Sequence, residues 1–244
     1  MGGERRIPLV FVADVADDCR VPAPTKKRLI VLLSILAAAA AIGAWWSASM
    51  ESASGPAPSA VLLAAIAIVA NLGLAILCAR GRVDAVIVAV GGRRLSWRRC
   101  ATDVAAALGM TASTYVVFAV ASRMLGSFGD ERLLSALLPR TPFELAMWMA
   151  TSVVAGTCEE LVFRDYLQHE LAQRLRSRAG GVIGQATVFA MAHAYQGPKR
   201  VVLNGLVALL FGRLACWRGD LRANILAHTL IDVLAGATVF VAVR

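Results

Sequence analysis

The sequence has little charge and very few histidines. Only 17% of its 244 residues are charged, and three are histidines. Soluble domains carry about 25% charged residues. Here 58% of residues are hydrophobic and the mean hydropathy is +0.67. This composition excludes an ordinary soluble domain and predicts an integral membrane protein.

The sequence also lacks paired cysteines. An odd number of cysteines with wide spacing indicates neither a disulfide framework nor a thiolate zinc site. A nucleophilic role for Cys158 is disfavoured, because no histidine is near it in the sequence and a thiol in apolar surroundings is poorly ionised. The five cysteines, interpreted as small apolar residues, are Cys19, Cys78, Cys100, Cys158 and Cys216.

Long apolar segments are the main feature that the sequence does have. A helix of about 20 residues crosses a hydrocarbon core of about 30 Å. Two segments are less clear, since Gly181–Tyr195 is short and Val201–Trp217 carries Arg213. Both are needed if the chain is to pass back and forth, so we predict an all-α polytopic membrane protein with about seven transmembrane helices. The five clear segments are Leu29–Met50, Ser59–Ala79, Val104–Ser122, Phe143–Phe163 and Asn224–Val243.

The positive charges are placed unevenly between these segments. Of the 25 Lys and Arg residues, 18 lie before the first span or between spans two and three, four and five, and six and seven, and Arg213 near the inner end of the sixth span makes 19. Positive loops stay in the cytoplasm, which predicts a plasma-membrane protein with its N-terminus inside and its C-terminus outside. Topology and anionic headgroups explain the net charge of +9, so we expect no nucleic-acid partner.

The first 27 residues are polar and contain Pro22 and Pro24. They lack the basic region, short apolar core and cleavage site of a secretory signal. We therefore predict a cytoplasmic tail over residues 1–27, followed by a first span that is retained as a helix.

The stretch CEELVFRDYLQ places two adjacent glutamates at the end of an apolar segment. A charge in the hydrocarbon region costs several kcal/mol, so it normally faces the bundle interior or a wet cavity. Residues four apart share a helix face, which pairs Glu160 with Arg164. Glu159 is turned about 100° away and has no local partner. The alternative interpretation is a solvated ion pair at the cytoplasmic end of a helix.

Two of the three histidines lie inside predicted spans. His193 follows Phe189 by four residues in FAMAH, and His228 precedes Asp232 by four residues in HTLID. Each pair therefore shares a helix face. A lone intramembrane histidine often forms only a hydrogen bond between helices. Two of them accompanied by unpaired acids indicate a functional site. We expect Glu159, His193, His228 and Asp232 to converge from three helices.

In this order, EELVFR, FAMAH and HTLID resemble the motifs EExxxR, FxxxH and HxxxN/D of the CPBP family. These intramembrane proteases include CAAX prenyl endopeptidases and bacteriocin-processing enzymes. The resemblance covers Pro142–Leu234, and Asp232 stands where many members have asparagine. It implies accessory helices one to three with a basic loop over residues 28–141, and a protease core of helices four to seven over residues 142–244.

The resemblance implies hydrolysis of a peptide bond inside the membrane, with Glu159, Glu160, His193, His228 and Asp232 as catalytic residues. Burial in an apolar bundle makes a carboxylate a stronger base, so Glu159, without a local partner, suits the activation of water. His193 would share or accept the water's proton and later protonate the leaving amine. His228, with Asp232, would stabilise the carbonyl oxygen as negative charge develops.

A second mechanism would use a divalent metal such as zinc. Two imidazoles and a carboxylate commonly bind zinc and leave one position open for water. The ligands would be His193, His228 and one acid, with Glu159 the first choice and Glu160 or Asp232 the others. The sequence has no HExxH motif, the usual helical zinc signature, and it does not separate the two mechanisms.

Two residues are expected to support the site, and one is expected at a different depth. Arg164 would hold Glu160 and the helix end, and Phe189 would share a face with His193. At 1.5 Å per residue, His193 lies about 10 Å deeper than Glu159 and His228. The short fifth helix must therefore tilt, begin earlier or line a cavity.

Two other function classes remain open from the sequence. The same fold could serve as a non-catalytic membrane partner or immunity protein. A proton or ion transporter would need a continuous polar path across both leaflets, and the first three spans offer little of one. For the protease, the expected partners are the lipid bilayer and a membrane-embedded or lipidated peptide or protein. That substrate could carry a CAAX motif or a bacteriocin leader, or be another membrane protein.

Overall fold

The computed structural model describes residues 26–52, 59–91, 96–126 and 138–242, and these residues form helices without a strand. The prediction of an all-α protein is therefore confirmed. All but the last two residues of the predicted tail 1–27 lie outside the described residues. The helices are α1 (Lys26–Ser52), α2 (Ala60–Ala79), α3 (Val83–Ala89), α4 (Trp97–Leu125), α6 (Pro142–Glu159), the π-helical η1 (Glu160–Leu167), α7 (Gln168–Leu175), α8 (Arg178–Ala192), the 3₁₀ turn η2 (Ala194–Gln196), α9 (Pro198–Arg218) and α10 (Arg222–Ala242).

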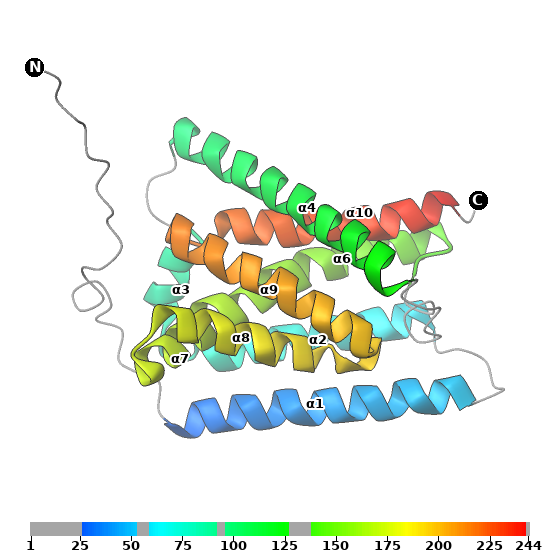
Figure 1. Ribbon diagram of the computed structural model, residues 1–244, viewed down its shortest axis with the longest axis horizontal. Coiled ribbons are helices and arrows are strands. Elements are labelled where there is room, and N and C mark those ends of the chain that lie inside the picture. Colours follow the sequence, from blue (N-terminus) through cyan, green and yellow to red (C-terminus); the bar gives the residue numbers. More distant parts are fainter. Residues whose placement is uncertain (1–25, 53–58, 92–95, 127–137, 243–244) are drawn as a thin grey trace, which may run out of the picture.

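The long helices lie roughly along one axis, and each runs in the opposite direction to the long helix before it (Figure 1). They are α1, α2, α4, α6, α8, α9 and α10. The start of α1, the end of α2, the start of α4 and the turn between α9 and α10 lie at the same end, together with α3 and α7. We call this the basic end. Segments that the sequence predicts to be cytoplasmic thus lie together, and their arginines include Arg28, Arg80, Arg82, Arg98, Arg99, Arg218 and Arg222.

Five of the described helices are long and apolar enough to cross a membrane, at residues 26–46, 60–79, 97–124, 198–218 and 222–242. These helices confirm a polytopic membrane protein. The predicted number of seven spans also counted α6, which has 18 residues, and α8, which has 15. Neither is among the five, because α8 is short and α6, with Glu144, Glu159 and several Ser and Thr among its 18 residues, is less apolar.

Local sequence signals explain where the helices that carry the site begin and end. Thr141 and Glu144 form a reciprocal capping box at the start of α6, which satisfies two unpaired amides there. Gly197 and Gly219 have φ of 88° and 69° and flank α9, where a side chain would be strained. Ser96 caps α4, so this helix begins seven residues before the predicted span Val104–Ser122.

Helices α6 and α10 approach each other closely across two glycines. A Cβ added to Gly156 would overlap Thr229, and one added to Gly236 would overlap Trp148. The indole nitrogen of Trp148 donates a 2.7 Å hydrogen bond to the Asp232 carbonyl oxygen. Small residues let helix backbones pack tightly in membranes. This packing brings the glutamate end of α6 to the histidine-bearing part of α10.

Candidate active site

The two adjacent glutamates lie where the helix changes its winding. Glu159 is the last residue of α6, and Glu160 is the first residue of the π-helix η1. The sequence predicted one regular helix from Phe143 to Phe163, so the π-helical turn is a correction to that expectation. Such wider turns often occur at functional sites. The Glu160 side chain is fully buried, whereas the Glu159 side chain is 17% exposed, so only Glu159 is accessible to water.

Glu160 is held by three side chains. Its Oε1 accepts hydrogen bonds from Arg164 Nη1 at 3.0 Å and from His228 Nδ1 at 2.8 Å. Its Oε2 accepts one from Asn224 Nδ2 at 3.1 Å. The predicted pairing with Arg164 is therefore present. Because both oxygens are occupied, Glu160 is placed to orient the His228 imidazole rather than to contact a substrate.

Arg164 lies between two aromatic rings. Its guanidinium carbon is 4.7 Å from the ring centre of Phe189 and 5.2 Å from that of Phe211. Both are cation–π distances, and the arginine is buried. Buried charges persist in proteins when they are paired and hydrogen-bonded. The two rings and Glu160 together fix Arg164, and this contact gives Phe189 a supporting position.

The second nitrogen of His228 faces two further acids. Its Nε2 lies 3.9 Å from Glu159 Oε2 and 3.8 Å from Asp232 Oδ2. Both distances exceed a direct hydrogen bond and suit a bridging water. The Asp232 side chain is 34% exposed, so water can reach this position. We call the space between these three atoms the acid–imidazole gap.

Sequence reasoning missed Asn224 as a site residue. Besides Glu160, its side-chain amide donates a 2.9 Å hydrogen bond to the carbonyl oxygen of Phe211 on α9. It thus links three helices while fully buried. A signal was present, since Asn224, His228 and Asp232 follow each other at intervals of four on α10 and therefore share one helix face.

His193 has different neighbours from the other predicted residues. It follows the end of α8, and its Nδ1 lies 2.8 Å from the carbonyl oxygen of Phe189. Its ring centre is 4.4 Å from that of Phe189 and 6.1 Å from that of Tyr195. Phe189 therefore contacts both His193 and Arg164. Within the described residues, His193 forms no hydrogen bond or ion pair with Glu159, Glu160, His228 or Asp232. Its participation in the site stays a prediction.

The residues present do not fit the metal site that the sequence left open. In the described part of the chain, no group of three or more His, Cys, Asp or Glu side chains is arranged to hold a metal ion. Glu160 already accepts three hydrogen bonds, and His193 stacks on Phe189 without a hydrogen bond or ion pair to the other candidate ligands among the described residues. The set Glu159, His193 and His228 is therefore not assembled, and we derive no step through a metal.

Comparison with known proteins gives one match. Residues 141–234 match the family model described as type II CAAX prenyl endopeptidase Rce1-like. No curated protein and no solved structure matches the chain. The matched segment contains EELVFR, FAMAH and HTLID, and it includes all of the acid–imidazole gap.

Proposed function

Because the chain belongs, through residues 141–234, to the Rce1-like family of type II CAAX prenyl endopeptidases, we propose that it hydrolyses a peptide bond within the membrane. The observation that carries this proposal is the acid–imidazole gap. There, His228 Nε2 lies 3.9 Å from a carboxylate oxygen of Glu159 and 3.8 Å from one of Asp232. A water molecule between an imidazole and a partly exposed carboxylate is suitably placed for activation.

Glu159 is the proposed general base. Its carboxylate lies at the gap and, unlike Glu160, accepts no hydrogen bond from the described residues. It takes one proton from a water in the gap, and the water oxygen bonds to the carbonyl carbon of the substrate. The same proton then passes to the leaving amine when the C–N bond breaks. One water is consumed, and the products are a carboxylic acid and an amine.

His228 is the proposed electrophilic group. With Nδ1 donating to Glu160, the orientation of the ring is fixed and Nε2 faces the gap. When Nε2 is also protonated, the ring is an imidazolium and its Nε2–H can donate a hydrogen bond to the carbonyl oxygen as that oxygen gains negative charge; the proton stays on the ring. Asp232 Oδ2 lies 3.8 Å from Nε2 and can contact it through a bridging water. Glu160, Arg164 and Asn224 act through His228 and are positioning residues.

His193 is proposed as a second proton carrier. A hydrogen bond from Nδ1 to the Phe189 carbonyl oxygen leaves Nε2 of the neutral ring as an acceptor. Such a nitrogen can share the water's proton if the substrate or a water chain bridges it to Glu159. The resemblance to the CPBP motifs supports this role.

The proposed substrate is a membrane-embedded or lipidated peptide or protein. An apolar cavity of about 440 Å³ lies between α4, α6 and α10, and its lining includes Val153, Thr157 and Thr229. Thr157 and Thr229 lie close in sequence to Glu159 and His228, respectively. An apolar cavity lined by α6 and α10, the two helices that also carry Glu159, His228 and Asp232, suits a substrate with a hydrophobic segment or lipid group. The description of the matched family, a prenyl endopeptidase, supports this class.

Comparison of peptide termini in membranes that carry wild type or Glu159→Gln tests the proposal. We expect new termini with wild type and their loss in Glu159→Gln. Glu144→Gln is the matched control, because Glu144 lies at the opposite end of α6 and only caps that helix. Identical termini for wild type and Glu159→Gln, at equal protein levels, would remove the peptidase proposal.

A further inference from the structure

A second polar cavity lies at the basic end, apart from the acid–imidazole gap. It has a volume of about 360 Å³ and is lined by Ser96, Arg98, Arg99, Thr102 and Arg218. It forms where α4 begins and α9 ends. Both helices are long and apolar enough to cross a membrane. The cavity therefore lies where helices of this kind meet the headgroup region of a bilayer.

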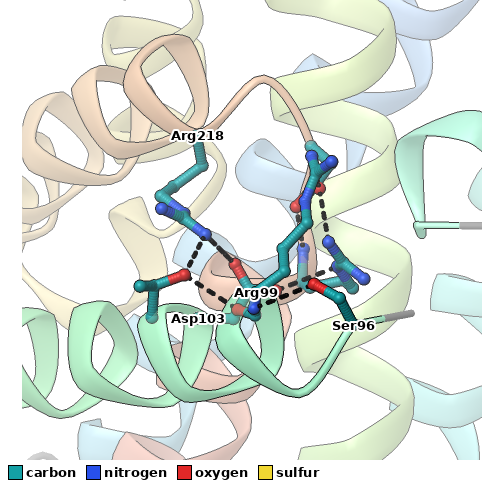
Figure 2. Close-up of polar contacts among 7 residues, drawn as sticks. Ser96, Arg99, Asp103 and Arg218 are labelled. Carbon is teal, nitrogen blue, oxygen red and sulfur yellow. Dashed lines mark hydrogen bonds and ion pairs between the residues drawn. The ribbon is translucent and has the colours of Figure 1, made fainter. Parts of the chain in front are cut away.

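The cavity adjoins an ion-pair network with more positive than negative groups (Figure 2). Asp103 on α4 pairs with Arg218 and, at 3.1 Å, with Arg222. Asp220, in the turn before α10, pairs with Arg99 at 2.8 Å and with Arg222 at 3.1 Å. Three guanidinium groups thus share two carboxylates. The network keeps one excess positive charge and fixes its arginines in position.

Arg98 adds a second positive charge at the same cavity. It is exposed and forms no ion pair with a described residue. Its guanidinium lies 5.7 Å from the ring centre of Trp97, so a flat aromatic side chain supports it. The net charge of the cavity favours an anion.

Two exposed tryptophans flank this cavity. Trp97 is 77% exposed and Trp217 is 72% exposed, and Arg218 lies 5.5 Å from the Trp217 ring centre. Tryptophans are enriched at the membrane–water interface, where the ring is apolar and the N–H is solvated. Their position next to the arginines indicates that the cavity opens at headgroup level rather than into bulk solvent.

The chemistry of the lining suits a phosphate group. Ser96 Oγ accepts a hydrogen bond from the backbone N–H of Arg99 at 3.3 Å and keeps a hydroxyl proton to donate. Guanidinium groups bind phosphate oxygens through charge-assisted hydrogen bonds. The N-terminus of the 29-residue helix α4 lies at the same place, and a helix N-terminus favours negative charge.

We infer that this cavity binds the headgroup phosphate of an anionic glycerophospholipid. The excess positive charge favours an anion. The two exposed tryptophans, Trp97 and Trp217, lie at the ends of two apolar helices and favour a membrane lipid over free phosphate. A bound headgroup joins α4 to α9 and, through Arg99 and Arg218, to the network at the start of α10. This inference does not depend on the proposed peptidase activity.

Native mass spectrometry of the full chain in detergent micelles tests it, with phosphatidylglycerol, phosphatidylcholine or inorganic phosphate added. We expect phosphatidylglycerol to bind at least about fivefold more tightly than phosphatidylcholine, from about 1 kcal/mol per basic residue at a membrane surface. Arg98→Gln should weaken phosphatidylglycerol binding by about the same factor. Arg140→Gln is the matched control, because this exposed arginine precedes α6, which begins at the other end of the bundle.

Each outcome decides the question. Loss of binding in Arg98→Gln but not in Arg140→Gln supports the inference. Equal loss in both variants shows a general charge effect and overturns it, as does equal binding of the two lipids by wild type. Displacement of phosphatidylglycerol by an equal concentration of inorganic phosphate overturns the lipid as the source of the phosphate. Equal unfolding temperatures of the two variants show that neither is misfolded.

Discussion

His228 and Glu160 form a 2.8 Å hydrogen bond between Nδ1 and Oε1, and this bond directs the other imidazole nitrogen toward Glu159 and Asp232. The bond joins two helices, since Glu160 begins η1 and His228 lies in α10. The buried carboxylate of Glu160 fixes the ring. The partly exposed carboxylates of Glu159 and Asp232 face its other nitrogen, Nε2. This division gives the neighbouring glutamates different tasks, from which separate predictions follow.

Glu160→Gln is predicted to affect stability much more than Glu159→Gln. Removing one partner of a buried ion pair leaves a charge without compensation, and here that charge is Arg164. The free energy of unfolding should fall by about 3–5 kcal/mol, measured by denaturant titration in micelles with circular dichroism. Glu159→Gln should lower it by less than about 1 kcal/mol, because its side chain is partly exposed and forms no hydrogen bond with a described residue. Equal effects of the two variants would contradict the assigned division of tasks.

His193→Ala is predicted to lower the cleavage rate by about 10²–10⁴-fold if His193 carries a proton. The substrate for this assay is one identified by the termini comparison. His169→Ala is the matched control, because its Nδ1 also lies close to the carbonyl oxygen four residues earlier, at 2.7 Å from Asp165. The control should retain wild-type activity. If His193→Ala cleaves as fast as His169→Ala, His193 is only a packing residue against Phe189.

Asp232→Asn is predicted to keep activity within about tenfold of wild type. The amide has the same shape as the carboxyl group, and the backbone position is held by the hydrogen bond from Trp148. Asp232→Leu should lose about 10²-fold, since no polar group then faces His228 Nε2. Initial cleavage rates of purified variants provide the measurement. Equal rates for Asn and Leu would show that Asp232 plays no part in the gap.

Gly156→Ala is predicted to separate the two helices that form the site. The added Cβ would overlap the Thr229 side chain and lie 2.9 Å from its backbone nitrogen. Overpacking of this kind lowers the free energy of unfolding by about 1–3 kcal/mol, and cleavage should slow with it. Gly109→Ala in α4 is the control, because nothing lies within 4 Å of its added Cβ. The control should be neutral or more stable by about 1 kcal/mol; a matching loss in both variants would refute the close-packing argument.

Treatment with a chelator is predicted to leave cleavage unchanged. Glu160 uses both oxygens for hydrogen bonds within the bundle, and His193 Nδ1 lies 2.8 Å from the Phe189 carbonyl oxygen. The described residues therefore lack an assembled ligand set. Rates with and without 1,10-phenanthroline, together with metal analysis of the purified protein, provide the measurement. Inhibition that zinc reverses would show that the side chains rearrange around a metal.

The sequence by itself determined the helical class of this protein and several contacts within single helices. Apolar segments of about 20 residues have few alternatives to membrane helices, so the all-α polytopic fold followed directly. The spacing of Glu160 and Arg164 predicted their ion pair, because a four-residue interval keeps two side chains together on a helix. The intervals of four along α10 likewise placed His228 and Asp232 on one face.

The tertiary structure alone decided which helix faces meet and at what depth. The approach of α6 to α10 depends on Gly156 lying against Thr229, a contact between residues 73 positions apart in the sequence. That approach places Glu160 against His228 and Asn224, whereas His193, at the end of α8, contacts Phe189. Periodicity fixes the faces of a single helix, but shape complementarity between helices fixes their relative position. Neither the contacts of Glu160 with Asn224 and His228 nor the cavity at the basic end could therefore be predicted from spacing.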